Sequence, residues 1–258
     1  MPAPRNTFKA ALAEGRTVIG CWLGMAEGYA AEIMGKAGFD WLVIDGEHSP
    51  NDLRSIRDQL IALAASPSHP VVRVPIGETW MIKQVLDAGA QTLLVPMVES
   101  AEQARQLVRA CTFPPLGARG VGYALARASD FAQIRDYGTT ADDQICLLVQ
   151  IESRAGLAAL DEILAIDGID GVFIGPADLA ADLGHIDNMM HPDVQSTIMQ
   201  ALSRIAASGK AAGILTTQDT MTNASIAAGA RFVAVGLDIS MLLATASETA
   251  AKWRDRTA

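Results

Sequence analysis

The chain is poor in aromatic residues and in cysteine. Aromatic residues make up 5% of its 258 residues, although half of all residues are hydrophobic, so Ala, Leu, Ile and Val must form most of the core. This composition suits helices packed on a buried parallel sheet. The three cysteines, Cys21, Cys111 and Cys146, are widely spaced, and no pair has the spacing of a zinc site. We therefore expect reduced, buried thiols.

Positive charge and long apolar runs are scarce as well. The formal net charge is −9, which argues against nucleic-acid binding because that function needs a basic face. Each apolar run ends well before the roughly 20 residues that a membrane span requires. Residues 1–16 also lack the apolar stretch of a signal peptide. The sequence predicts a cytoplasmic protein without nucleic-acid or membrane partners.

Short apolar runs instead alternate with amphipathic, Ala-rich segments along the whole chain. Strands are expected at residues 18–22, 41–44, 71–74, 92–95, 145–150, 171–174, 211–215 and 232–235. Helices are expected at residues 30–37, 51–65, 79–88, 101–110, 156–165, 193–207, 220–228 and 239–253. Eight such units predict one domain, residues 1–258, folded as a (βα)8 TIM barrel. An open doubly wound sheet is the alternative, but no Gly-x-Gly-x-x-Gly follows the first strand.

Two kinds of connection interrupt this pattern. The pair Ala-Gly ends a helix before a strand at Gly38, Gly89 and Gly229, where a glycine helix cap explains it. Residues 112–143 and 177–192 are expected to be long loops, which in compact domains usually serve as lids or contact surfaces.

The predicted carboxyl ends of the strands carry polar side chains. In a barrel these ends face one mouth, where catalysis takes place. The residues there are Trp22, Asp45, Glu47, His48, Arg73, Pro96, Gln150, Glu152, Asp178 and Leu215.

Glu152 and Asp178 follow two consecutive strands and are expected to lie close together. Converging carboxylates repel each other unless a cation neutralises them, and hard oxygen ligands favour Mg²⁺ or Mn²⁺ over zinc. Gln150 points to the same side of its strand as Glu152 and could donate to a metal-bound oxygen. The competing interpretation is that both acids only stabilise helix N-termini.

Arg73 and His48 complete the predicted site. An arginine in a buried strand must be ion-paired or bind an anion, and its place near the mouth favours the anion. His48 titrates near neutral pH and can transfer protons, and Asp45 could hold the tautomer of its imidazole. The sequence predicts a metal-assisted enzyme.

Several segments then carry a resemblance to a known family. They are Trp41–Ser49, Lys83–Gln91, Val95–Met97, Gln150–Glu152 and Gly175–Leu179. In this order they resemble the HpcH/HpaI aldolase family, and the resemblance covers nearly the whole chain. Tyr123 stands where a small residue is expected.

The resemblance implies a phosphoenolpyruvate/pyruvate-type barrel with class II aldolase activity, which uses a divalent cation (Mg²⁺, Mn²⁺ or Co²⁺) instead of a lysine Schiff base. The implied reaction cleaves 4-hydroxy-2-oxo acids, such as 4-hydroxy-2-oxoheptanedioate from aromatic catabolism, to pyruvate and an aldehyde. The reverse addition would accept many aldehydes. A 2-dehydro-3-deoxy sugar-acid aldolase is the alternative within this family.

By the same resemblance Glu152 and Asp178 hold the metal, and Arg73 stabilises the enolate. Gln150 and the backbone of Gly175, Pro176 and Ala177 assist, while His48 with Asp45 moves protons. Trp22 and Leu215 line the substrate pocket, and Leu215, Arg119 and Tyr123 are expected to tune aldehyde choice. Asp87 is expected to reach the His-Asp pair of a neighbouring subunit. This implies a homohexamer, a trimer of dimers, with exchanged C-terminal helices.

Two further functions compete with the aldolase. A phosphoenolpyruvate-type lyase would need more cationic residues at the mouth than Arg73 and Arg119. A binding or regulatory subunit with an inactive site is disfavoured because His48, Arg73, Glu152 and Asp178 are all present.

Overall fold

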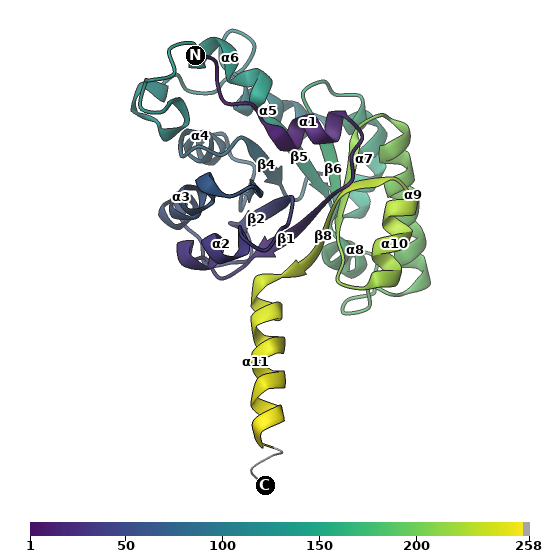
Figure 1. The fold of residues 1–258 in the computed structure, drawn as a ribbon. Coiled ribbons are helices and arrows are strands. Elements are labelled where there is room, and N and C mark those ends of the chain that lie inside the picture. The colour runs from purple at the N-terminus through teal and green to yellow at the C-terminus, as the bar shows by residue number, and fades with distance from the viewer. Residues whose placement is uncertain (255–258) are drawn as a thin grey trace.

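The computed structural model describes residues 1–254 and folds as a closed barrel of eight parallel strands (Figure 1). The (βα)8 prediction is confirmed, and the open doubly wound sheet is excluded because β1 pairs with β8. The strands are β1 Val18–Leu23, β2 Trp41–Asp45, β3 His69–Arg73, β4 Thr92–Val95, β5 Cys146–Ile151, β6 Gly171–Ile174, β7 Ala211–Leu215 and β8 Ala230–Leu237. Each expected strand exists, with bounds that differ by two residues or fewer.

Helices connect the strands and cover the outside of the barrel. They are α1 Thr7–Ala13, α2 Gly28–Met34, α3 Leu53–Ala62, α4 Thr79–Asp87, α5 Ala101–Cys111, α6 Tyr137–Thr140, α7 Arg154–Leu164, α8 Pro176–Asp182, α9 Pro192–Ala207, α10 Asp219–Ala227 and α11 Asp238–Arg254. Short 3-10 turns are η1 Leu63–Ala65, η2 Tyr123–Leu125, η3 Arg127–Ser129 and η4 Asp142–Gln144. Among the described residues, no helix is both long and apolar enough to cross a bilayer.

The sequence pattern missed three helices. α1 lies in the N-terminal segment, and α8 occupies the first part of the expected 177–192 loop. Pro176 begins α8, where its missing N–H costs nothing. The 112–143 connection also contains α6 and three 3-10 turns. The expected glycine caps are confirmed at Gly89 and Gly229, which follow the C-cap residues Ala88 and Ala228 and have φ of 108°. Gly38 also has a positive φ, 95°, but it does not cap α2, which ends at Met34 with Gly35 as its cap.

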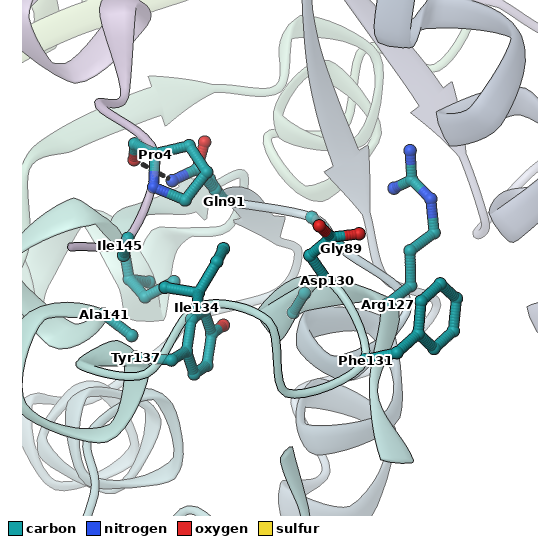
Figure 2. A pocket seen from close by; sticks show the side chains of 13 residues that line it. Pro4, Gly89, Gln91, Arg127, Asp130, Phe131, Ile134, Tyr137, Ala141 and Ile145 are labelled. Carbon is teal, nitrogen blue, oxygen red and sulfur yellow. Dashed lines mark hydrogen bonds between the residues drawn. The ribbon is translucent and has the colours of Figure 1, made fainter. Parts of the chain in front are cut away.

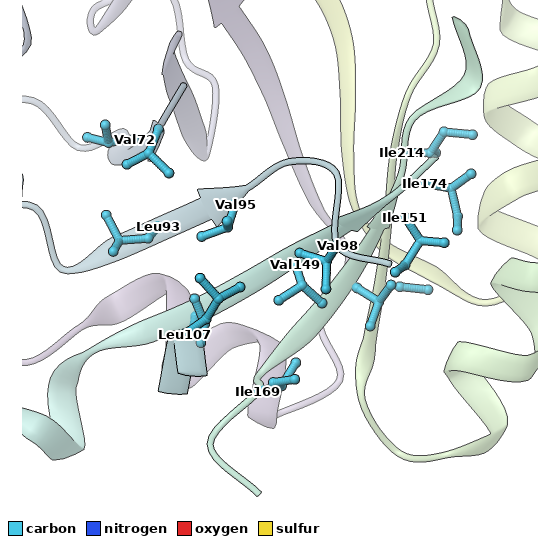
Figure 3. Close-up of a cluster of buried hydrophobic side chains, with 14 of the residues drawn as sticks. Val72, Leu93, Val95, Val98, Leu107, Val149, Ile151, Ile169, Ile174 and Ile214 are labelled. Carbon is cyan, nitrogen blue, oxygen red and sulfur yellow. The ribbon is translucent and has the colours of Figure 1, made fainter. Parts of the chain in front are cut away.

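Two apolar layers hold the barrel together. The outer layer packs strand side chains such as Val72, Val149 and Ile174 against the helices (Figure 3). The inner layer fills the barrel with large rings that require small neighbours. A Cβ on Gly20 would lie 2.3 Å from the Trp41 ring, and one on Gly213 would lie 2.2 Å from the Phe232 ring. The interior is therefore a packed core and not a channel.

α1 closes the end of the barrel where the strands begin. Its Phe8 lies 5.7 Å from Trp41 and 6.0 Å from Phe232 between ring centroids. Asn6 caps α1 and donates from its amide to Thr92 Oγ1 at 3.0 Å, which ties the helix to β4. With this end sealed, the open mouth is the one at the carboxyl ends of the strands.

The last helix behaves differently from the others. α11 leaves the carboxyl end of β8 and projects away from the barrel (Figure 1). Its apolar side chains Ile239, Met241, Leu242 and Leu243 are exposed, with Leu243 at 66%. Neighbouring exposed apolar side chains of this kind are uncommon on the surface of a monomeric protein.

Candidate active site

A cavity of about 280 Å³ opens at the carboxyl ends of the strands. Eleven of the residues expected in the site line it. These residues are Trp22, Asp45, His48, Arg73, Gln150, Glu152, Gly175, Pro176, Ala177, Asp178 and Leu215. The barrel topology therefore brings together side chains that lie up to 193 residues apart, from Trp22 to Leu215.

Arg73 and Asp45 form a two-point ion pair on neighbouring strands. The register of β2 and β3 places the two residues opposite each other. Arg73 Nε donates to Asp45 Oδ1 at 2.8 Å, and Nη2 donates to Oδ2 at 2.6 Å. Both side chains are buried, so the guanidinium is rigidly oriented.

Two further contacts surround this guanidinium. Arg73 Nη1 lies 2.8 Å from Glu47 Oε2, and its Cζ lies 5.3 Å from the centre of the Trp22 ring. Burial alone would raise the pKa of Asp45, but the hydrogen bonds and charge of Arg73 outweigh it and lower that pKa. Asp45 is therefore ionised beside the guanidinium of Arg73.

Glu152 is the buried carboxylate of the cavity. Its Oε1 accepts the Met97 amide at 2.9 Å, and its Oε2 accepts Gln150 Nε2 at 2.5 Å. Met97 has φ of 52°, a conformation that is rare for a residue with a side chain and often found at functional sites. Burial raises the pKa of Glu152, and the negative charge of Asp178 adds to the rise. The environment thus favours a positive charge between these acids.

The surroundings of Glu152 also fit a cation. Gln150 Oε1 is buried and has no hydrogen-bond partner among the described residues, so it is a free oxygen donor beside the carboxylate. Gly175 leaves the space open, because a Cβ there would lie 2.2 Å from Glu152 Oε2. Asp178 approaches from the first turn of α8 and is exposed. Carboxylate and amide oxygens form the ligand set that Mg²⁺ or Mn²⁺ prefers.

His48 lines the cavity from the loop after β2 and is exposed. The expected contact between Asp45 and its imidazole does not occur among the described hydrogen bonds. Asp45 Oδ1 meets His48 only through the backbone amide, at 3.4 Å, because Arg73 takes both carboxylate oxygens. Asp45 therefore orients Arg73 and shapes the turn that carries His48.

Three residues expected to act in the site lie outside this cavity. Asp87 ends α4, and its Oδ1 lies 3.2 Å from Nη2 of the fully buried Arg119. Tyr123 packs against Phe113 and Tyr137, with ring centroids 5.6 and 5.5 Å apart. Within one chain, Arg119 and Tyr123 therefore build the 112–143 connection and do not touch the space beside Glu152.

Five residues that line the cavity were not foreseen as such: Gly24, Ser49, Phe173, Leu237 and Ile239. Ser49 directly follows His48, so its position was a usable signal. Leu237 and Ile239 were missed because β8 runs to Leu237 and not only to residue 235, which carries the start of α11 to the mouth.

A second cavity, of about 270 Å³, lies where β4 and β5 begin, at the opposite end of the barrel. Figure 2 shows its wall, with Gln91, Asp130, Ile134, Tyr137 and Ile145 around it. None of the expected site residues lines it, and it has no second carboxylate beside Asp130. The chemistry therefore favours the cavity at the carboxyl ends.

Comparisons with known proteins agree on one family. The profile of HpcH/HpaI aldolase/citrate lyase matches residues 18–245. A hydroxypyruvate/pyruvate aldolase of Roseobacter denitrificans is 67% identical over 98% of this chain and 99% of its own length. A 4-hydroxy-2-oxo-heptane-1,7-dioate aldolase of Escherichia coli is 52% identical over 96% and 95%.

A solved structure agrees with these sequence matches. The crystal structure of an HpcH/HpaI aldolase/citrate lyase family protein from Burkholderia cenocepacia has a TM-score of 0.93 and 41% identity, and it covers 96% of this chain and 99% of its own. The likeness extends over the whole barrel, so it includes every strand end that lines the cavity.

Proposed function

Because the chain belongs to the HpcH/HpaI aldolase/citrate lyase family and is an aldolase, a carbon-carbon lyase, we propose that it is a metal-dependent aldolase for 2-oxo acids. It joins pyruvate or hydroxypyruvate to an aldehyde and cleaves the resulting 4-hydroxy-2-oxo acid. The observation that carries this proposal is the buried Glu152 with Asp178, Gln150 and Arg73 around one cavity.

A divalent cation would be held by Glu152 and Asp178. It would polarise the keto group of the donor and so acidify the neighbouring carbon. Gln150 and Met97 orient the Glu152 carboxylate through their hydrogen bonds. No lysine lines the cavity, which supports metal chemistry over a Schiff base.

Arg73 stabilises the negative charge that develops on the donor oxygen when the proton leaves. Its guanidinium is fixed by Asp45 before the substrate arrives, so little reorganisation is needed during the reaction. His48 moves the proton at the donor carbon and at the aldol hydroxyl, because it lines the same cavity and an imidazole can do so near neutral pH. The Ala177 amide, at the start of α8, binds the donor carboxylate, because Pro176 has no N–H and the Gly175 amide donates to Ile151 O at 3.1 Å.

We base the proposed donor substrates on the names of the most similar relatives that are described above. The Roseobacter denitrificans relative at 67% identity is named for hydroxypyruvate and pyruvate, and the Escherichia coli relative at 52% for 4-hydroxy-2-oxo-heptane-1,7-dioate. We therefore place hydroxypyruvate and pyruvate first as donors and the heptanedioate from aromatic catabolism second. A cavity of about 280 Å³ suits donors of this size with a short or hydroxylated aldehyde.

One experiment tests the proposal directly. Purified protein is treated with a chelator and assayed for pyruvate release from 4-hydroxy-2-oxo acids, then supplied with Mg²⁺, Mn²⁺ or Co²⁺. Turnover should vanish with the chelator and return with the ion. Trapping of a pyruvate adduct by borohydride would instead identify a Schiff base. Glu152→Gln is the matched variant, since it keeps the shape but removes the charge.

We also propose that the active enzyme is a homohexamer, a trimer of dimers that exchanges α11 between subunits. Support comes from the exposed apolar side chains of α11 and from its projection away from the barrel (Figure 1). Asp87, held by Arg119 and one quarter exposed, would then serve the His48 site of a neighbouring subunit.

A further inference from the structure

A cluster of potential metal ligands lies outside the cavity, in the connection between α8 and α9. His185 follows α8, while His191 and Asp193 stand at the start of α9. One ligand atom from each of the three residues lies within 4.8 Å of the others. None of the three lines the catalytic cavity.

The distances within this cluster are close to those of a metal site. His185 Nε2 lies 3.9 Å from Asp193 Oδ2, and His191 Nδ1 lies 3.8 Å from the same oxygen. A tetrahedral ion with bonds of about 2.0–2.2 Å holds its ligand atoms about 3.4 Å apart. Each His–Asp distance is therefore about half an ångström longer than in such a site, and all three ligand atoms lie within 4.8 Å of one another, so the side chains must move closer to hold one ion.

The backbone already holds the two histidines side by side. The His185 amide donates to Ala180 O at 2.7 Å, the Asn188 amide to His185 O at 2.9 Å, and the His191 amide to Asn188 O at 3.1 Å. The two imidazole rings stack with centroids 3.6 Å apart and an angle of 15°. The backbone thus keeps the two histidines within reach of each other before an ion binds.

We propose that His185, His191 and Asp193 form a second, peripheral site for a transition-metal ion such as Zn²⁺, with water in the remaining position. Two imidazoles and one carboxylate suit Zn²⁺, Co²⁺, Ni²⁺ or Cu²⁺, whereas the oxygen ligands beside Glu152 suit Mg²⁺ or Mn²⁺. The two sites therefore select different ions, and this one does not depend on the proposed aldolase chemistry.

Binding must rearrange two contacts. A metal lies in the plane of each imidazole that binds it, so the stacked rings have to turn apart. Nδ1 of His191 also accepts the amide of Asp193 at 3.2 Å and caps α9. An ion that uses this nitrogen displaces that amide. Both histidines are only partly buried, with side chains 26% and 31% exposed, so the surface leaves room for the turn.

The test uses the full chain with Glu152→Gln and Asp178→Asn, which removes the catalytic carboxylates. Zn²⁺ binding is measured by calorimetry in excess Mg²⁺, with metal analysis after dialysis. We expect this double variant to retain one class of Zn²⁺ site. Adding His191→Asn should weaken Zn²⁺ binding at least about tenfold, while the asparagine still caps α9. Asp193→Asn should act likewise, and Asp219→Asn, which also removes an acid from the first turn of a helix, α10, should change nothing.

A second measurement uses the unaltered protein, so that a folding defect cannot decide the result. Substoichiometric Zn²⁺ in excess Mg²⁺ should shift the imidazole NMR signals of His185 and His191 and leave those of His69 in place. Equal Zn²⁺ affinity in the His191→Asn and parent proteins would overturn the proposal. So would unshifted His185 and His191 signals at saturating Zn²⁺.

Discussion

Arg73 and Asp45 face each other across β2 and β3 and are joined by two hydrogen bonds of 2.8 and 2.6 Å. This pair decides between two interpretations of a buried arginine that the sequence left open. Arg73 is ion-paired with its neighbours and also lines the cavity. The ion pair fixes the direction of the guanidinium, which is compatible with the proposed role of Arg73 in binding a substrate anion.

Arg73→Lys should lower aldol cleavage by several orders of magnitude. An ammonium cannot keep two contacts to Asp45 and still reach the substrate oxygen. The same variant should no longer exchange the methyl protons of pyruvate in deuterated water, followed by NMR. Arg154→Lys, on the exposed start of α7, is the control and should behave like the parent. Normal exchange in a folded Arg73→Lys protein would assign Arg73 a purely structural role.

Gly175→Ala should abolish tight metal binding without unfolding the barrel. The new Cβ would lie 2.2 Å from Glu152 Oε2 and 2.9 Å from its Cβ, so Glu152 has to move. We expect at least a tenfold loss in Mn²⁺ affinity by calorimetry. Gly122→Ala is a matched control, because nothing lies within 4 Å of its Cβ and its φ is not positive. Unchanged Mn²⁺ affinity in Gly175→Ala would remove Glu152 from the ligand set.

The sequence predicted the eight strands because parallel strands buried on both faces leave near-continuous apolar runs. It predicted that Arg73, Glu152 and Asp178 lie around one cavity because barrel strand ends converge wherever they stand in the chain. It could not show that Asp45 binds Arg73 and not the imidazole of His48, since that choice depends on register and side-chain direction. α8 was missed for another reason. Its seven residues are too few to show helical periodicity in the sequence.

On acidification, metal affinity should begin to fall at a higher pH than it would if Glu152 had the pKa of an ordinary glutamate. Burial, with the charge of Asp178, raises the pKa of Glu152 above 4.5 in the metal-free protein. Protons therefore compete with the cation for the Glu152 carboxylate once the pH falls to this raised pKa. Asp45 behaves in the opposite way, because its pKa is lowered in the folded protein. Its ion pair with Arg73 stabilises the fold above the pKa that Asp45 has in the unfolded chain. This stabilisation is lost only as the pH falls through the lower pKa of Asp45 in the folded protein.

Acidification should thus release the metal before it weakens the Arg73–Asp45 pair. Calorimetric titration with Mn²⁺ across a pH series should show the affinity declining while circular dichroism is still that of the native barrel. An affinity that stays constant down to pH 4.5 would show that Glu152 is not perturbed, or does not bind the ion.

Two inactive variants should restore activity when they share an oligomer. Asp87→Asn keeps its own Glu152, and Glu152→Gln keeps its own Asp87. If Asp87 serves a neighbouring subunit, mixed oligomers contain sites with both groups, about a quarter of all sites in a random equal mixture. The chains are mixed after reversible dissociation, and the oligomer is checked by sedimentation. Failure to recover activity in a mixed hexamer would confine Asp87 to its own chain, where it pairs with Arg119.

Leu215→Ala should change aldehyde preference and leave donor activation nearly intact. Leu215 ends β7 and lines the cavity with Leu237 and Ile239, an apolar part of the wall that has no proton-transfer group. The larger space should favour bulkier aldehydes, with a shift in kcat/KM ratios of about tenfold, the amount that one or two methylenes in a pocket decide. Proton exchange of pyruvate, measured in parallel, should stay within a few-fold of the parent rate.

Leu157→Ala on α7, outside the cavity, controls for a general loss of stability. Equal loss of aldol cleavage and of proton exchange in Leu215→Ala would mean that this side chain shapes the space around Glu152 itself, and the division into a donor half and an acceptor half would be wrong.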